Sequence, residues 1–142
     1  MRRAGIARGG VETVIQRIDH PGELELRLGH ATLPGVYREA VRALAREIGG
    51  GGDAAEERPV ALDSTGPETL LADLLNEVLY LAEADGFLAR DVIVDELADG
   101  RMRARLVGGR GTPRGLVKAA TYHGLRVWHA RGRWHATVVL DV

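Results

Sequence analysis

A leucine-rich stretch within residues 67–85 restricts the fold of this chain more than any other feature. Its apolar side chains recur at helical spacing: Leu70, Leu71, Leu74, Leu75, Val78, Leu79, Leu81 and Ala82. Thr65-Gly66-Pro67-Glu68 matches a capping box, with Thr65 as the expected N-cap and Glu68 reaching back to it, and Asp85-Gly86 predicts the end of the helix. A helix with so broad an apolar face has to be buried, so the chain must fold in layers around it.

A strand and another helix are predicted before this segment. Three leucines alternate with three charged residues, Leu24, Leu26 and Leu28 with Glu23, Glu25 and Arg27, which is typical of a strand with one exposed face. Thr32 offers an N-cap and Pro34 fits a first helical turn. Apolar residues then recur at helical spacing over 37–48, and the glycines at 49–52 predict the end of this helix.

The remaining segments favour β-structure. We expect strands over residues 60–62, 92–97, 102–107, 116–122, 125–129 and 134–142. Asp99-Gly100 and Arg131-Gly132 predict tight turns, and 108–115 predicts a mobile loop, since no helix pattern follows it to complete a phosphate-binding turn. We therefore expect an α+β fold in which two helices pack on a mostly antiparallel sheet as a two-layer domain over residues 16–142. Residues 1–15, which begin rich in arginine and glycine, are expected to form a disordered arm.

Composition excludes several classes of function. The 142 residues include no cysteine, which excludes disulfides, thiolate metal sites and cysteine nucleophiles, so a metal would need oxygen or imidazole ligands. A net charge of -1 argues against a basic nucleic-acid clamp, and an aromatic content of 4% argues against a base-stacking platform. No apolar run approaches the roughly 20 residues of a membrane span, and the N-terminus lacks the apolar core of a signal peptide, so we expect a cytoplasmic protein.

Carboxylates at the chain end form the first candidate site. Asp141 and the α-carboxylate of Val142 could offer several hard oxygen ligands to one cation, and Glu23 and Glu25 would join them if the first and last strands were neighbours. From residue types alone, a solvated chain end and an ordinary exposed strand face remain the simpler explanations. The chain contains none of the familiar hydrolase, metalloprotease or P-loop motifs.

A second candidate is the polar cluster of Lys118, Thr121, Tyr122 and His123 within an otherwise strand-like run. Lys118 could contact an anion or a partner, and His123 could be a ligand or a hydrogen-bond donor. Edge-strand polarity with a hydrogen-bonded histidine explains the same residues. His129 and His135 do not have a recognised zinc spacing. Asn76, in the leucine-rich helix, could cap it or bridge to a strand.

Three segments together resemble the archease family. Residues 74–81 with 85–88 are similar to the second-helix segment of that family. Residues 118–125, Lys-Ala-Ala-Thr-Tyr-His-Gly-Leu, resemble its Lys-Ala-x-Thr-Tyr-His-x-Leu signature, and the ending Leu140-Asp141-Val142 matches its terminal Leu-Asp-Val or Leu-Asp-Ile. Near the N-terminus, residues 19–23 read Asp-His-Pro-Gly-Glu where archeases read Asp-His-Thr-Ala-Asp, so the metal-binding aspartate of the family falls on Glu23.

This resemblance implies a function. Archeases bind a divalent cation through residues that correspond to Glu23, Asp141 and Val142, and Ca²⁺ or Mg²⁺ suits such oxygen ligands. The resemblance implies an accessory protein, not an enzyme, that activates an RNA-splicing (tRNA) ligase by promoting its guanylylation and repeated turnover, and that reaches RNA only through this partner. The alternatives are a chaperone-like partner of an RNA methyltransferase and a stand-alone metal-dependent hydrolase. Lys118, with Thr121, Tyr122 and His123, is the further candidate contact to a partner.

Overall fold

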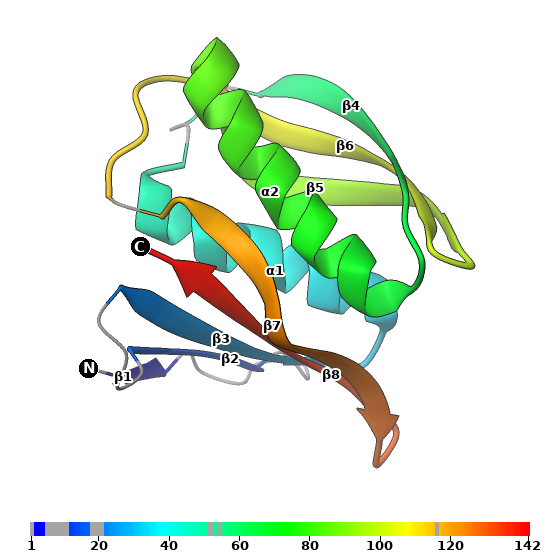
Figure 1. Cartoon of the computed structure of the whole chain (residues 1–142). Coiled ribbons are helices and arrows are strands. Elements are labelled where there is room, and N and C mark those ends of the chain that lie inside the picture. The colour runs from blue at the N-terminus through cyan, green and yellow to red at the C-terminus, as the bar shows by residue number, and fades with distance from the viewer. Residues whose placement is uncertain (1, 5–11, 18–21, 51–52, 54, 116) are drawn as a thin grey trace.

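Two helices lie between two antiparallel sheets in the computed structural model of the chain (Figure 1). The structure describes residues 2–4, 12–17, 22–50, 53, 55–115 and 117–142. Its elements are β1 (Arg2–Ala4), β2 (Glu12–Arg17), β3 (Glu23–His30), α1 (Leu33–Ile48), β4 (Glu56–Asp63), α2 (Pro67–Asp85), β5 (Phe87–Ala98), β6 (Arg101–Arg110), β7 (Ala119–Ala130) and β8 (Arg133–Asp141). Neither described helix is long and apolar enough to cross a membrane.

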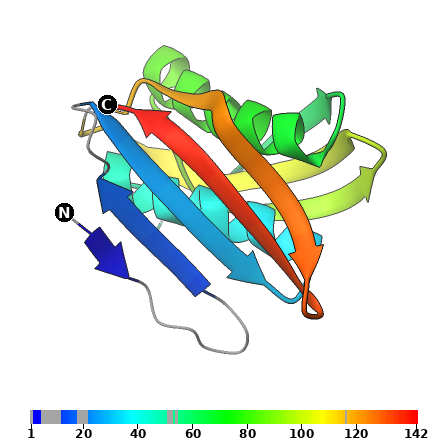
Figure 2. The ribbon, with the colours of Figure 1, turned by 60° about the horizontal axis from the view of Figure 1, so that its bottom comes forward.

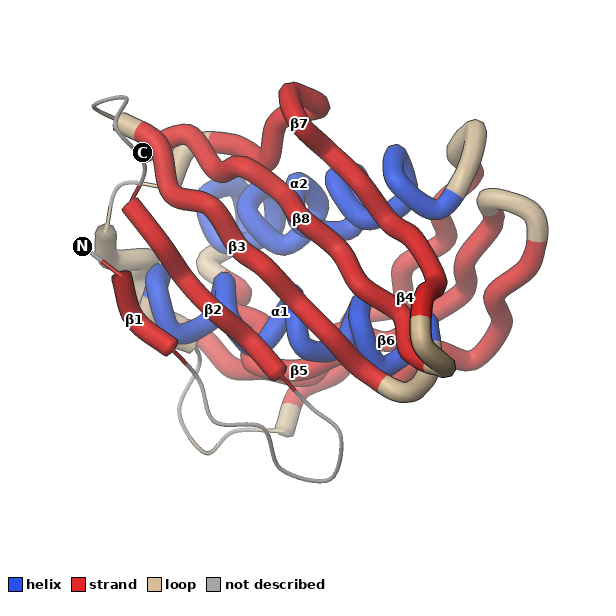
Figure 3. The backbone as a smooth tube through the Cα atoms, turned by 90° about the horizontal axis from the view of Figure 1, so that it is seen from below, coloured by secondary structure: helices blue, strands red, loops and turns tan. Residues whose placement is uncertain are grey.

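The strands form a larger and a smaller sheet on opposite sides of the helices. The larger sheet has the order β1-β2-β3-β8-β7 and the smaller one the order β4-β6-β5 (Figures 2 and 3). The α+β class is confirmed, but the expected two layers are three. The physical reason is the breadth of the apolar surface of the helices, which needs a sheet on each side to cover it.

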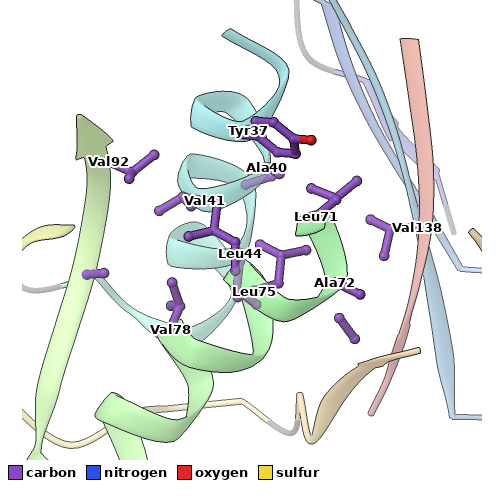
Figure 4. Packing of buried hydrophobic residues seen from close by; sticks show 14 of the residues in the cluster. Tyr37, Ala40, Val41, Leu44, Leu71, Ala72, Leu75, Val78, Val92 and Val138 are labelled. Atoms are coloured by element: carbon purple, nitrogen blue, oxygen red, sulfur yellow. The ribbon is translucent and has the colours of Figure 1, made fainter. Parts of the chain in front are cut away.

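The core fills the space on both sides of this helical layer. Side chains of α1 and α2 meet Val92 of β5 on one side and Val138 of β8 on the other (Figure 4). Tyr37 is fully buried, and its hydroxyl donates a 3.0 Å hydrogen bond to the carbonyl oxygen of Pro67, which links the two helices. Burial of its ring raises the pKa of Tyr37 far above the ordinary range of tyrosine.

Local sequence signals set the limits of α1. Thr32 is its N-cap, and the Oγ1 atom accepts a 3.1 Å hydrogen bond from the Gly35 amide. Gly49 ends the helix with a φ of 81°, a left-handed conformation that favours glycine. Both limits of this helix are as predicted.

The start of α2 differs from the prediction by one residue. Gly66 is the N-cap, and its amide donates to the Thr69 hydroxyl at 3.2 Å. The expected pair of Thr65 with Glu68 is wrong, because the helix begins one residue later and the third helical position is occupied by Thr69. Gly86 ends the helix as expected, with a φ of 64°.

Several strand boundaries also differ. The two strands expected over 116–122 and 125–129 form one strand, β7, whose pairing with β8 is irregular between Thr121 and Arg126. The expected loop at 108–115 begins later, since β6 continues to Arg110, and the short strand at 60–62 is the centre of a longer β4. Both tight turns are confirmed by positive φ angles at Asp99, Gly100, Arg131 and Gly132.

The arm expected over residues 1–15 contains strand instead in its described parts. Arg2–Ala4 forms β1, and Glu12–Arg17 forms β2, which pairs with β3. Thr13 and Ile15 are buried, because the alternation of this segment continues the inner face of the sheet beside the leucines of β3. Residues 19–21 of the Asp-His motif and Leu116 lie outside the described residues.

Candidate functional site

The strand that begins at Glu23 and the last strand of the domain are neighbours, as the acidic site requires. β3 and β8 pair antiparallel (Figure 2), and Glu23 lies directly opposite Asp141 in the register of these two strands. One residue beyond, the Val142 amide donates a 2.7 Å hydrogen bond to the Gly22 carbonyl oxygen. The prediction that an early glutamate meets the acidic tail is thus correct for the backbone positions of Glu23 and Asp141.

Glu23 and Asp141 occupy the closest kind of cross-strand position. Because Gly22 and Val142 share the backbone hydrogen bond, Glu23 and Asp141 form the adjacent non-hydrogen-bonded pair, in which Cα atoms are typically about 4.5 Å apart. Their neighbours Leu24 and Leu140 are buried in the core, so both carboxylates are on the outer face. Like charges directly opposite each other destabilise a sheet, and a cation between them would remove that cost.

The chain terminus is held against the start of β3. Gly22 has a φ of 89°, and a Cβ atom placed on it would lie 3.3 Å from the Val142 oxygen. A larger residue at position 22 would therefore be strained and would press on the terminus. The main chain thus places Val142 opposite Gly22, one residue from the pair of Glu23 and Asp141.

The donor set fits a hard cation only if the terminus takes part. Among the described residues, no three aspartate, glutamate or histidine side chains form a group that could hold a metal ion. Glu25 is a further expected carboxylate on this face. It accepts a 2.7 Å hydrogen bond from Arg27, so its side chain is paired within β3. Glu23, Asp141 and the main-chain oxygen of Val142 remain, and Ca²⁺ and Mg²⁺ prefer oxygen ligands of these kinds.

Lys118 lies next to this acidic pair. Its amide donates a 2.7 Å hydrogen bond to the Asp141 carbonyl oxygen, and the following residue, Ala119, is the β7 partner of Asp141. The Lys118 side chain is exposed. The structure therefore brings Lys118 to the acidic site.

Other members of the signature segment hold β7 in place. The Thr121 hydroxyl donates to the Val139 carbonyl oxygen at 3.2 Å. The Tyr122 hydroxyl donates to Asp73 of α2 at 2.7 Å, and this hydrogen bond raises the pKa of Tyr122. His123 is exposed within the irregular stretch of β7. Thr121 and Tyr122 thus have structural partners, whereas Lys118 and His123 face solvent.

Asn76 bridges α2 to β7, which is one of the two roles expected for it. Its Nδ2 donates to the Ala120 carbonyl oxygen at 3.0 Å, and its Oδ1 accepts from the Ala120 amide at 2.8 Å. A side-chain amide thereby pairs with the backbone as a neighbouring strand would. This bridge holds the start of β7, and with it Lys118, beside the terminus.

Replacing Asn76 with alanine is expected to reduce the free energy of unfolding by about 2–4 kcal/mol, because the Ala120 amide and carbonyl would both lose their partner in a buried position. Urea denaturation measures this change. Glu83→Ala, at an exposed position on the same helix, is the matched control and should change stability by less than about 0.5 kcal/mol. Equal stability of the two variants would contradict a supporting role of the bridge.

Known proteins resemble this chain in sequence and in fold. The sequence profile of the Archease protein family matches residues 16–142. Protein archease of Methanosarcina barkeri is 29% identical over 138 residues, which cover 88% of this chain and 93% of that protein. Protein archease of Methanopyrus kandleri is 31% identical over 138 residues, which cover 89% of this chain and 98% of that protein.

Solved structures agree with these sequence relatives. Protein 1598 of Methanobacterium thermoautotrophicum superposes with a TM-score of 0.69 at 25% identity, covering 90% of this chain and 98% of that one. A Thermotoga maritima protein, described as an archease and possible chaperone, shares the fold with a TM-score of 0.65 at 19% identity, covering 89% and 96%. The fold and site define a small α+β protein with an acidic C-terminal end. The chain belongs to the archease family.

Proposed function

We propose that this protein is a divalent-metal-binding activator of an RNA-splicing (tRNA) ligase, promoting guanylylation of the ligase and its repeated turnover. The observation that supports the proposal is the direct opposition of Glu23 and Asp141, next to a terminus fixed by the hydrogen bond from Val142 to Gly22. Two facing carboxylates and a third at the chain end are costly without a cation. A cation bound between these carboxylates would remove this cost.

The residues that would hold the ion are Glu23, Asp141 and Val142, through carboxylate oxygens alone. Glutamate is one methylene longer than the aspartate of the family and can ligate bidentately, which suits the flexible coordination of Ca²⁺ better than the strict octahedron of Mg²⁺. When bound, the ion would supply a concentrated positive charge. The chain itself would position this charge on the rigid edge formed by β3 and β8.

Activation follows from binding in this proposal, and no group of this chain acts on RNA or nucleotide. The acidic end would dock on the ligase near its nucleotide pocket, with Lys118 as an additional contact to the partner. To promote guanylylation, the protein must bind the reactive conformation of the ligase more tightly than the resting one. A near-neutral accessory protein without a catalytic motif is consistent with this role.

A second candidate is a chaperone-like partner of an RNA methyltransferase. The description of the Thermotoga maritima structure as a possible chaperone favours it. A chaperone role would depend on the apolar or mobile surfaces of the protein and not on Asp141. Substitution of Asp141 should therefore affect ligase activation but not a chaperone role, which distinguishes the two candidate functions.

A C-terminal extension tests the proposal directly. A short tag after Val142 moves the α-carboxylate away from Glu23 and Asp141, and we expect at least tenfold weaker Ca²⁺ binding by calorimetry. GTP-dependent labelling of a candidate ligase should fall in parallel. The same tag at the N-terminus is the control and should change neither result. Equal metal affinity of the two tagged forms would refute a role of the terminal carboxylate, and unaltered labelling would refute the proposed activation.

A further inference from the structure

A short basic and aromatic segment lies at the end of the larger sheet away from the acidic site. Residues 126–135 contain three arginines, two histidines and both tryptophans of the protein, with no acidic residue. They form the turn end of the β7–β8 hairpin, which extends past the helices (Figure 1). The low aromatic content of the whole chain therefore conceals a local concentration on one hairpin.

On the outer face of this hairpin the side chains form a continuous stack. Trp128 and His135 are cross-strand partners, and their rings are stacked with centroids 5.3 Å apart and an interplanar angle of 21°. The Arg126 guanidinium lies over the Trp128 ring, 4.4 Å from its centroid. Arginine, tryptophan and histidine thus lie in one row across two strands.

A depression adjoins this stack on the side of β3. It has a volume of about 220 Å³ and is lined by Arg27, Leu28, Gly29, Trp128, His135, Ala136 and Thr137. Gly29 is the β3 partner of His135, and because it has no side chain, the space beside the His135 ring is left open. Arg27 borders the same space, with its side chain 57% exposed.

We propose that this outer hairpin face, formed by Arg27, Gly29, Arg126, Trp128 and His135, binds single-stranded RNA. A base would enter the depression and stack beside His135 and Trp128, and the flanking phosphates would lie near Arg27 and Arg126. Stacking on aromatic rings combined with arginine contacts is how proteins bind single strands without sequence preference. Binding of a single strand is inferred from the arrangement of these side chains. The choice of RNA over DNA rests on the proposed function.

Charge favours a nucleic acid over a protein as the occupant. The chain has a net charge of -1, yet residues 126–135 carry three arginines and no carboxylate. Two acidic residues lie near the depression on the same sheet: Glu25 is paired with Arg27, and Glu12 is the β2 partner of Gly29. A polyanion with flat rings complements both the charge and the shape of this face.

Fluorescence anisotropy of a labelled 12-residue oligo(U) with the isolated protein tests the proposal. Trp128→Ala should weaken binding roughly tenfold, and Trp128→Phe, which keeps an aromatic ring, should retain most of the affinity. Arg126→Gln should weaken binding and reduce the salt dependence by about one phosphate contact. Arg103→Gln is the control, because Arg103 is 75% exposed on the smaller sheet and the charge change is identical.

This inference would be overturned by no binding of the unaltered protein, by equal affinity of Trp128→Ala and Arg103→Gln, or by tighter binding of an RNA duplex than of the single strand. A change of oligomeric state in Trp128→Ala without a change in RNA affinity would also overturn it, since the face would then contact a second copy. Chelator should leave RNA binding unaltered, so this test is independent of the ligase and of the metal.

Discussion

Asp141→Asn is expected to weaken divalent-cation binding at least roughly 100-fold and to abolish activation of a ligase partner. The substitution removes one of two facing carboxylates while keeping the shape of the side chain. Changes in residues that merely support metal ligands already cost roughly 10–100-fold, and the loss of a ligand should cost no less. Calorimetry with Ca²⁺ and Mg²⁺ and GTP-dependent labelling of the ligase measure the two effects.

The fold should be unaffected by this change, which makes the result interpretable. Asp141 is on the outer face, while Leu140 beside it is fully buried and is left in place. Removing a like charge opposite Glu23 should raise stability slightly if it changes it at all. Glu25→Gln, on the same face but paired with Arg27, is the control and should retain both metal binding and activation.

The same variant separates the competing functions. A chaperone-like protein should suppress aggregation of its partner equally well with Asp141→Asn. A stand-alone hydrolase would instead show hydrolysis by the isolated protein that the variant loses. Full activation of a ligase by Asp141→Asn would contradict the metal-centred proposal.

Gly108→Ala is expected to destabilise the protein by about 3 kcal/mol or to prevent folding. A Cβ atom on Gly108 would lie 2.0 Å from the Leu88 carbonyl oxygen and 2.8 Å from the Ala89 Cα atom. Both are backbone atoms of the neighbouring strand β5, so no side-chain rotation relieves the clash. Gly108 is on the central strand of the smaller sheet, opposite Glu56 on one side and Ala89 on the other.

Gly66→Ala provides the matched control for this clash. Gly66 has extended backbone angles, and a Cβ atom there would meet Glu68 at an ordinary 3.6 Å. Gly66→Ala should lower the free energy of unfolding by about 1 kcal/mol or less, because alanine is a poorer N-cap than glycine. Thermal and urea denaturation of the two variants measure the difference, and similar stabilities would show that the strands separate easily at Gly108.

The predictions that the structure contradicts, such as the start of α2 and the N-terminal arm, differ for physical reasons. Thr65 has a good capping side chain, but the helix starts one residue later, and Thr69 at its third position accepts a hydrogen bond from the Gly66 amide. The arginine- and glycine-rich beginning suggested an arm up to residue 15, whereas Thr13 and Ile15 contribute to the core. The percentage of aromatic residues is an average over the chain and does not show that both tryptophans are on one hairpin.

Interactions between residues close in the chain were determined by the sequence itself. The limits of α1 at Thr32 and Gly49, the end of α2 and the two hairpin turns depend on contacts within a few residues, so local residue types suffice to predict them. The resemblance to archease at residues 19–23 and at the chain end also predicted Glu23, Asp141 and Val142 as metal ligands, and this assignment stays a prediction.

Only the tertiary structure decided which distant segments meet. The register that sets Glu23 against Asp141 joins residues near opposite ends of the chain, and the two sheets on either side of the helices arise from burial of the whole apolar surface. The outer hairpin face likewise depends on three strands: Arg126 and Trp128 are on β7, His135 is on β8, and Gly29 of β3 leaves space beside them. Strand pairing and burial are collective, and no single segment carries the information that fixes them.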